Sequence, residues 1–104
     1  MEKFWDSNLD LNEGKTVVEI IKDIDAGLIK GLYVQGENPA MSDPDLIQTR
    51  KGLAKLDHLV VQDIFMTETA WFADVILPAT AHAEKLGTYT YTNRQVQIGR
   101  KVVD

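Results

Sequence analysis

The sequence predicts an α/β fold: an open parallel sheet with helices on both faces, followed by a β-hairpin at the C-terminus. Three short apolar runs indicate the strands, at Leu32–Val34, Leu59–Gln62 and Val75–Leu77. Each run is continuous rather than alternating, which is typical of a parallel sheet covered on both sides. Segments of helical periodicity separate the runs, as in a series of strand–helix–strand units. The length fits one domain, so we expect residues 1–104 to form a single unit.

The chain opens with an arm and a helix. Residues 1–13 are mostly polar with isolated large apolar side chains, so we expect a loosely packed arm there. Thr16 and Glu19 have the spacing of a capping box, in which each residue satisfies a free backbone N–H of the other's turn. Apolar residues follow at helical intervals, and Gly27 is typical of a C-terminal stop. The sequence therefore predicts a helix between Thr16 and Gly27.

A turn-rich stretch, residues 36–45, separates the first strand from the second helix. Its prolines, glycine and short polar side chains prevent a strand from continuing. Asp43 followed by Pro44 predicts the N-cap and the first position of that helix. After the second strand, Thr67 and Thr69 are expected to open a short third helix.

The C-terminal residues 88–100 change in character. Apolar and polar side chains alternate on both sides of a turn at Asn93–Arg94, which predicts a hairpin.

Composition excludes several classes of function. No cysteine is present, which excludes disulfides and any zinc or iron–sulfur site held by cysteines of this chain. The formal net charge of −5 argues against a nucleic-acid-binding protein, because phosphate affinity depends on clustered Lys and Arg. No apolar run approaches the ~18 residues of a membrane helix. We therefore expect a soluble, cytoplasmic protein that binds neither nucleic acid nor membrane.

Three segments lie at the carboxyl ends of the predicted strands, at 36–39, 62–65 and 78–80. In an open parallel sheet, ligands bind beyond the carboxyl ends of the strands, so we expect these segments to converge on one site. Asn38 can both donate and accept hydrogen bonds, and Asp63 can accept two from a planar ligand edge or a ribose.

The same residues allow other interpretations. The helix that Thr67 opens would present free N–H groups, which suit a phosphate. Alternatively, residues 36–39 form only a turn and Asp63 caps the next helix. His82 beside Glu84 has the residue types of a general base and its orienting carboxylate, but no nucleophile motif accompanies them, which favours a solvated pair. Neither a GxGxxG nor a Walker motif is present, so the sequence does not support a self-sufficient dinucleotide or ATP site.

Several motifs, taken together, resemble a known family. In chain order they are GENP, SDPD, VVQDIF, TETA, ADVILP and an AEK-GT turn before a TxT strand. This order and spacing are similar to those of the molybdopterin oxidoreductases, and within them to the catalytic alpha subunits of formate dehydrogenases. The likeness covers roughly residues 16–103.

The resemblance implies a Rossmann-like α/β half domain. In the full-length enzymes, the strand-end loops of this domain hold one of two pyranopterin guanine dinucleotides, which together bind molybdenum or tungsten. The positions that match these cofactor-holding loops follow the three strands, at Gly36, Glu37, Asn38, Pro39, Gln62, Asp63, Thr67, Thr69, Pro78 and Thr80.

The chain lacks other parts of the family pattern. It has no cluster-binding cysteines, no Cys or selenocysteine metal ligand, and no counterpart of the catalytic histidine and arginine. We therefore expect a fragment of a longer subunit, with no catalytic residue, no metal ligand and no cofactor bound to the isolated chain.

Two functions are compatible with these observations. The first is the pterin-guanine-dinucleotide-binding portion of a formate dehydrogenase-like oxidoreductase, whose partners are the remainder of the catalytic subunit and an iron–sulfur electron-transfer subunit. The second is a free-standing α/β module that binds partner proteins through an edge strand or the aromatic hairpin.

Overall fold

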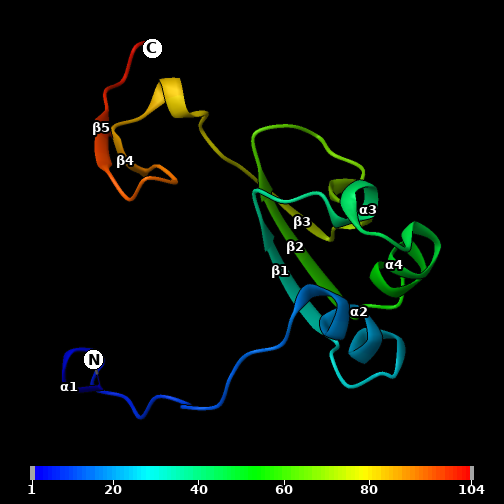
Figure 1. Cartoon of the computed structure of the whole chain (residues 1–104). Helices are drawn as coiled ribbons and strands as arrows, with labels where there is room; N and C mark the ends of the chain where they lie inside the picture. The colour runs from blue at the N-terminus through cyan, green and yellow to red at the C-terminus, as the bar shows by residue number, and fades with distance from the viewer. Residues whose placement is uncertain (1, 104) are drawn as a thin grey trace.

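A three-stranded sheet backed by helices forms the body of the molecule, and a separate hairpin follows it (Figure 1). The structure, a computed structural model, describes residues 2–103. Its elements are α1 (Glu2–Trp5), α2 (Val17–Asp25), β1 (Gly31–Gln35), α3 (Pro39–Ser42), α4 (Leu46–Leu53), β2 (His58–Asp63), η1 (Ala70–Phe72), β3 (Val75–Pro78), η2 (His82–Glu84), β4 (Gly87–Thr90) and β5 (Val96–Gly99). The labels η1 and η2 mark single turns of 3₁₀-helix.

The three strands of the sheet are parallel and lie in the order β1-β2-β3. Leu32 lies opposite Leu59, and Val61 has Val34 on one side and Ile76 on the other. The helices α3 and α4 connect β1 to β2, and η1 connects β2 to β3. The predicted α/β class, the three predicted strands and the C-terminal hairpin are therefore confirmed.

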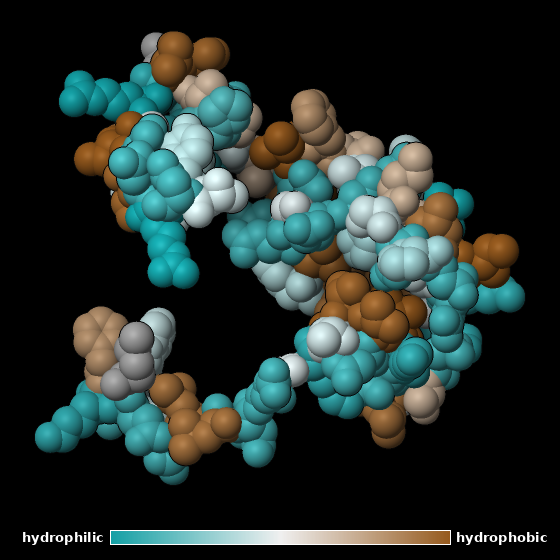
Figure 2. All heavy atoms as spheres, viewed as in Figure 1, coloured by the Kyte–Doolittle hydropathy of each residue, from teal (hydrophilic) through white to brown (hydrophobic). Residues whose placement is uncertain are grey.

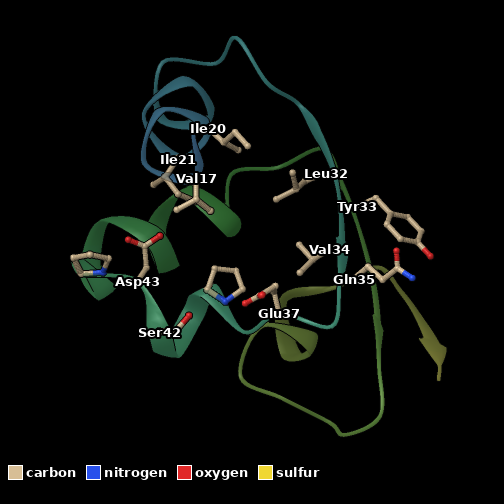
Figure 3. Close-up of a pocket in the computed structure, with 12 residues that line it drawn as sticks. Val17, Ile20, Ile21, Leu32, Tyr33, Val34, Gln35, Glu37, Ser42 and Asp43 are labelled. Carbon is tan, nitrogen blue, oxygen red and sulfur yellow. The ribbon is translucent and has the colours of Figure 1, made fainter. Parts of the chain in front are cut away.

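One face of the sheet carries the hydrophobic core. The side chains of Leu32 and Val34 point toward α2 (Figure 3). The helices α2 and α4 pack closely at Gly52, where an added Cβ would lie 3.7 Å from the Ile24 side chain. Buried core residues come from two strands, two helices and η1, namely Val34, Ala40, Leu53, Leu59, Val61 and Ala70.

The opposite face of the sheet is open. Strand alternation places Tyr33, Val60 and Leu77 on this face. Tyr33 is 52% exposed and Leu77 is 40% exposed. Within residues 2–103, the helices that pack on the sheet do so on the core face (Figure 1). A helical cover over the second face stays a prediction.

Helix α2 has the termini that the sequence predicts. The Glu19 carboxylate accepts a hydrogen bond from the Thr16 backbone N–H at 2.7 Å, and the Thr16 hydroxyl accepts one from the Glu19 N–H at 3.4 Å. Gly27 has a φ of +74°, the left-handed conformation that ends many helices. The capping box and the glycine stop are confirmed.

Helix α4 begins later than predicted. Its N-cap is Asp45, whose carboxylate accepts a hydrogen bond from the Gln48 N–H at 3.0 Å. Asp43 instead ends α3, since its N–H bonds the Pro39 carbonyl. Pro44 disfavours helical backbone in the residue before it, and Asp43 is accordingly extended at ψ 143°. The prediction of Asp43 and Pro44 as helix start is therefore wrong by two residues.

The arm and the hairpin lie away from the body (Figure 1). The radius of gyration is 16.6 Å, against about 13 Å for a compact chain of this length. In the arm, α1 has no buried side chain. In the hairpin, Thr88 pairs with Ile98 and Thr90 with Val96, and Arg94 takes φ +64° in the turn. No helix within residues 2–103 is long and apolar enough to cross a bilayer.

Candidate functional site

The carboxyl ends of the three strands meet at one edge of the sheet. The Gly36 N–H donates to the Gln62 carbonyl at 2.9 Å, which ties the end of β1 to the end of β2. Asp63 lies opposite Pro78, and its carbonyl accepts the Ala79 N–H at 3.0 Å. Hydrogen bonds therefore bring the three predicted loop segments together.

Gly36 turns the chain out of β1. Its φ is +63°, a conformation that glycine adopts without strain. A Cβ added at this position would meet no atom within 4 Å. The glycine is thus required by the backbone conformation, and the space beside it is open.

Asn38 uses its side chain inside the protein. Its Oδ1 accepts hydrogen bonds from the Thr69 N–H at 3.1 Å and from the Thr69 hydroxyl at 2.8 Å. Its Nδ2 donates to the Glu68 carboxylate at 2.7 Å. The Thr69 hydroxyl in turn accepts the Ala40 N–H at 3.0 Å. Asn38 and Thr69 therefore link the loop after β1 to the loop after β2.

The predicted phosphate site lies at the helix that Thr67 opens. The helix is a single 3₁₀ turn, η1. The Thr69 N–H bonds Asn38, and the Ala70 N–H bonds the Thr67 hydroxyl at 3.3 Å. Because side chains already occupy these N–H groups, the geometry gives no support to a phosphate here, and the phosphate contact at Thr67 stays a prediction.

Gln62 and Asp63 point to different sides of the sheet edge, since they are neighbours on one strand. The Gln62 amide oxygen accepts a hydrogen bond from the Tyr33 hydroxyl on the open face. One Asp63 carboxylate oxygen accepts the N–H of Ile64 at 2.7 Å. Asp63 therefore contacts the adjacent residue and does not cap the next helix.

The loops at this edge are acidic. Glu37 follows β1, Asp63 ends β2, and Glu68 lies in the loop after β2. The Asn38 amide holds the pKa of the Glu68 carboxyl below its ordinary value, with smaller contributions from the Glu68 backbone N–H and the Arg50 charge. A phosphate is disfavoured near such a group, whereas hydrogen-bond donors of a ligand are favoured.

The last two predicted site residues are Pro78, at the end of β3, and Thr80, in the loop after it. Pro78 ends β3 opposite Asp63, and Thr80 is exposed. Farther on, the Glu84 carboxylate accepts the Ala81 N–H at 2.7 Å and so closes the turn η2. Among the described residues, the Glu84 carboxylate forms no hydrogen bond or ion pair with His82, so this geometry gives no support to the general-base alternative.

A cavity of about 510 Å³ lies between α2 and the outer edge of β1 (Figure 3). Figure 2 shows the apolar surface beside α2 at this place. Of the predicted site residues, only Glu37 and Pro39 line it. Its walls are mainly apolar and come from α2, β1 and α3, with Val17, Ile20, Ile21, Leu32 and Val34 among them. The cavity is therefore a neighbour of the strand-end edge, not the crevice that the sequence predicts.

Sequence reasoning missed three side chains near the site. Glu68 bonds Asn38, and the Arg50 guanidinium donates to the Ala40 carbonyl at 2.8 Å. Asp43 lines the cavity, and its Oδ2 is buried with no hydrogen-bond partner among the described residues. The Glu68–Asn38 and Arg50–Ala40 contacts join segments that a turn or many residues separate in the chain. Residue spacing alone therefore does not predict them. Within residues 2–103, no three His, Cys, Asp or Glu side chains cluster to hold a metal.

Comparison with known proteins identifies the class. A family model described as molybdopterin oxidoreductase matches residues 3–104. The chain belongs to the molybdopterin oxidoreductase family.

Individual relatives are catalogued as alpha subunits of oxidoreductases. The F420-dependent formate dehydrogenase subunit alpha of Methanocaldococcus jannaschii is 53% identical over 103 residues, which is 99% of this chain and 15% of the relative. The F420-dependent formate dehydrogenase 1 subunit alpha of Methanococcus maripaludis is 46% identical over 101 residues, 96% of this chain and 15% of the relative. The NADPH-Fe(3+) oxidoreductase subunit alpha of Geobacter sulfurreducens is 41% identical over 102 residues, 98% of this chain and 12% of the relative. The chain thus spans less than a sixth of these relatives.

Proposed function

We propose that the chain forms one wall of a binding site for a pterin guanine dinucleotide in a formate dehydrogenase-like oxidoreductase. The observation that carries this proposal is the hydrogen-bonded edge at which the loops after β1, β2 and β3 meet. In open parallel sheets such an edge is where nucleotide ligands bind. The family supplies the class of cofactor.

The donor and acceptor groups at the edge fit the nucleoside end of that cofactor. Guanine presents N–H donors on one edge, and ribose presents hydroxyls. The carboxylates of Asp63 and Glu37 accept hydrogen bonds from such donors. The open space at Gly36 admits a flat ligand beside the backbone. The acidic loops do not fit a pyrophosphate, so we place the guanosine, rather than the phosphates, against Asp63.

Six of the ten positions predicted as cofactor contacts divide into two groups by their geometry. We propose that Gly36, Glu37, Asp63 and Thr80 face the nucleoside. Asn38 and Thr69 hold the loops instead, because their polar atoms bond each other. When bound, the cofactor supplies redox chemistry through a molybdenum or tungsten ion held by its dithiolenes.

The names of the relatives support a role in cofactor binding over a role in substrate choice. Similar segments occur in proteins named for formate and for NADPH and Fe(3+). A segment shared by enzymes with different reactions serves what they have in common. We propose formate as the substrate of the whole enzyme, in the cytoplasm, with the remainder of the catalytic subunit and an iron–sulfur subunit as partners.

A titration of the chain with GDP tests the nucleoside assignment. We expect millimolar, saturable shifts of the Gly36 and Asp63 amide signals in nitrogen–proton NMR spectra, and none with ADP at equal concentration. Asp63→Asn keeps the oxygen that bonds Ile64 but removes the charge, so it should weaken GDP binding about tenfold. The matched control is Asp57→Asn, at the opposite end of β2.

Equal shifts with GDP and ADP would refute guanine recognition. Unchanged affinity in Asp63→Asn would remove Asp63 from the site. Saturable binding of a protein and not of GDP would favour the interaction module.

A further inference from the structure

Two buried threonines differ sharply in how their hydroxyls are used. Thr69 is 0% exposed and Thr49 is 1% exposed. The Thr69 hydroxyl donates to Asn38 Oδ1 and accepts the Ala40 N–H, at 2.8 and 3.0 Å. The Thr49 hydroxyl has no hydrogen-bond partner among residues 2–103. A buried hydroxyl is unfavourable unless it is bonded, so only Thr69 gains from its oxygen.

The bonds of Thr69 join parts of the chain that are far apart in sequence. Asn38 and Ala40 precede it by 31 and 29 residues. One partner ends the turn that follows β1, and the other is the buried residue of α3. Thr69 itself precedes η1 on the connection from β2 to β3. The Thr69 hydroxyl therefore connects the loop after β1 to the loop after β2 at the candidate site.

Neighbouring bonds extend the same connection. The Ala40 carbonyl accepts the Arg50 guanidinium at 2.8 Å, which ties α3 to α4. Asn38 Nδ2 binds the carboxylate of Glu68, the residue before Thr69. The Thr69 hydroxyl and Ala40 lie in the buried part of this network, where a low dielectric strengthens hydrogen bonds, whereas the bond to Glu68 is exposed.

We propose that Thr69 is a positioning residue, which sets the placement of the loop after β1 relative to the loop after β2 through its buried hydroxyl. This inference rests on the proposed function for its consequence: the two loops carry the carboxylates assigned to the nucleoside. Thr69 touches no ligand in this arrangement, because its side chain is fully buried.

The test compares Thr69→Val, Thr69→Ser and Thr49→Val in the full chain. Thr69→Val has nearly the same shape but leaves the Ala40 N–H without its acceptor. We expect the Ala40 amide to exchange with solvent about tenfold faster, the equivalent of one lost hydrogen bond. The Gly36 and Asp63 amide signals should shift, and GDP affinity should fall about tenfold, although neither residue touches Thr69.

The other two variants are the controls. Thr69→Ser keeps the hydroxyl and should restore the exchange rate, both amide signals and GDP affinity. Thr49→Val removes an unbonded hydroxyl and should leave all three unchanged, with equal or higher resistance to unfolding.

Each outcome separates the two proposals. Unchanged Ala40 exchange in Thr69→Val, or GDP affinity equal to that of the wild type, would overturn the positioning role and leave the nucleoside site in place. Failure of the wild-type chain to bind GDP would refute the nucleoside site. The Gly36 and Asp63 amide signals alone would then test whether Thr69 positions the two loops.

Discussion

At the scale of single residues, the candidate site depends on side chains that hydrogen-bond each other. Asn38 has the groups of a ligand-binding residue, yet the three hydrogen bonds of its side chain among the described residues go to Glu68 and Thr69. Spacing correctly placed Asn38 in a loop after β1, but could not reveal a partner 31 residues away. Side-chain chemistry alone therefore overestimates how many polar residues at a strand end are free for a ligand.

The bond between Asn38 and Glu68 makes stability depend on pH. The pKa of Glu68 lies below its ordinary 4.5 in the folded chain, so the ionised carboxylate favours folding. This contribution is complete above the ordinary value and is lost as pH falls through the lowered one. We expect Glu68→Gln to lose less stability than the wild type between about pH 7 and about pH 3. Urea unfolding at the two pH values measures the difference, and equal losses in both proteins would contradict it.

At the scale of elements, local sequence signals predicted a strand or a helix end correctly where only one position fitted the signal. Continuous apolar runs identified β1, β2 and β3, and the capping box and Gly27 bounded α2. The prediction of where α4 starts failed because Asp43 and Asp45 are both suitable N-caps. The choice between them is made by α3, a helix of one turn that spacing does not reveal.

The N-cap of α2 provides a measure of how much such a local signal contributes. Thr16→Ala removes the hydroxyl that accepts the Glu19 N–H. The chain should lose about 1 kcal/mol of unfolding free energy, as is usual for a lost threonine cap. Thr92→Ala, in the hairpin turn, is the matched control and should have no effect on unfolding of the body. A loss below the error of urea unfolding would mean that α2 is held by packing alone.

At the scale of the whole molecule, the sheet is one-sided and has two open edges. Within the described residues, β1 and β3 each pair only with β2. On β3, Val75, Ile76 and Leu77 are each about 40% exposed. The sequence predicted helices on both faces of the sheet because both faces of these strands are apolar. Among the described residues, helices pack on one face.

Open apolar edge strands pair with other chains. We therefore expect the isolated chain to self-associate, and Ile76→Lys, which places a charge on β3, to reduce this. Sedimentation velocity at increasing concentration measures the effect, with the arm substitution Leu11→Lys as a control for charge alone. Concentration-independent sedimentation of the wild type would contradict the expectation.

The two hydrogen bonds from Thr69 to Asn38 Oδ1 also bear on the order of folding. Closing a loop of 31 residues carries an entropic cost of about 3 kcal/mol, more than the roughly 2 kcal/mol that two such bonds return. These bonds are therefore favourable only after β1 and β2 have paired and shortened the effective loop. In kinetic terms they belong to the native side of the folding barrier, so their loss should speed unfolding and leave the folding rate unchanged. The strand-end edge that these bonds hold is then the last part of the body to form and the first to open.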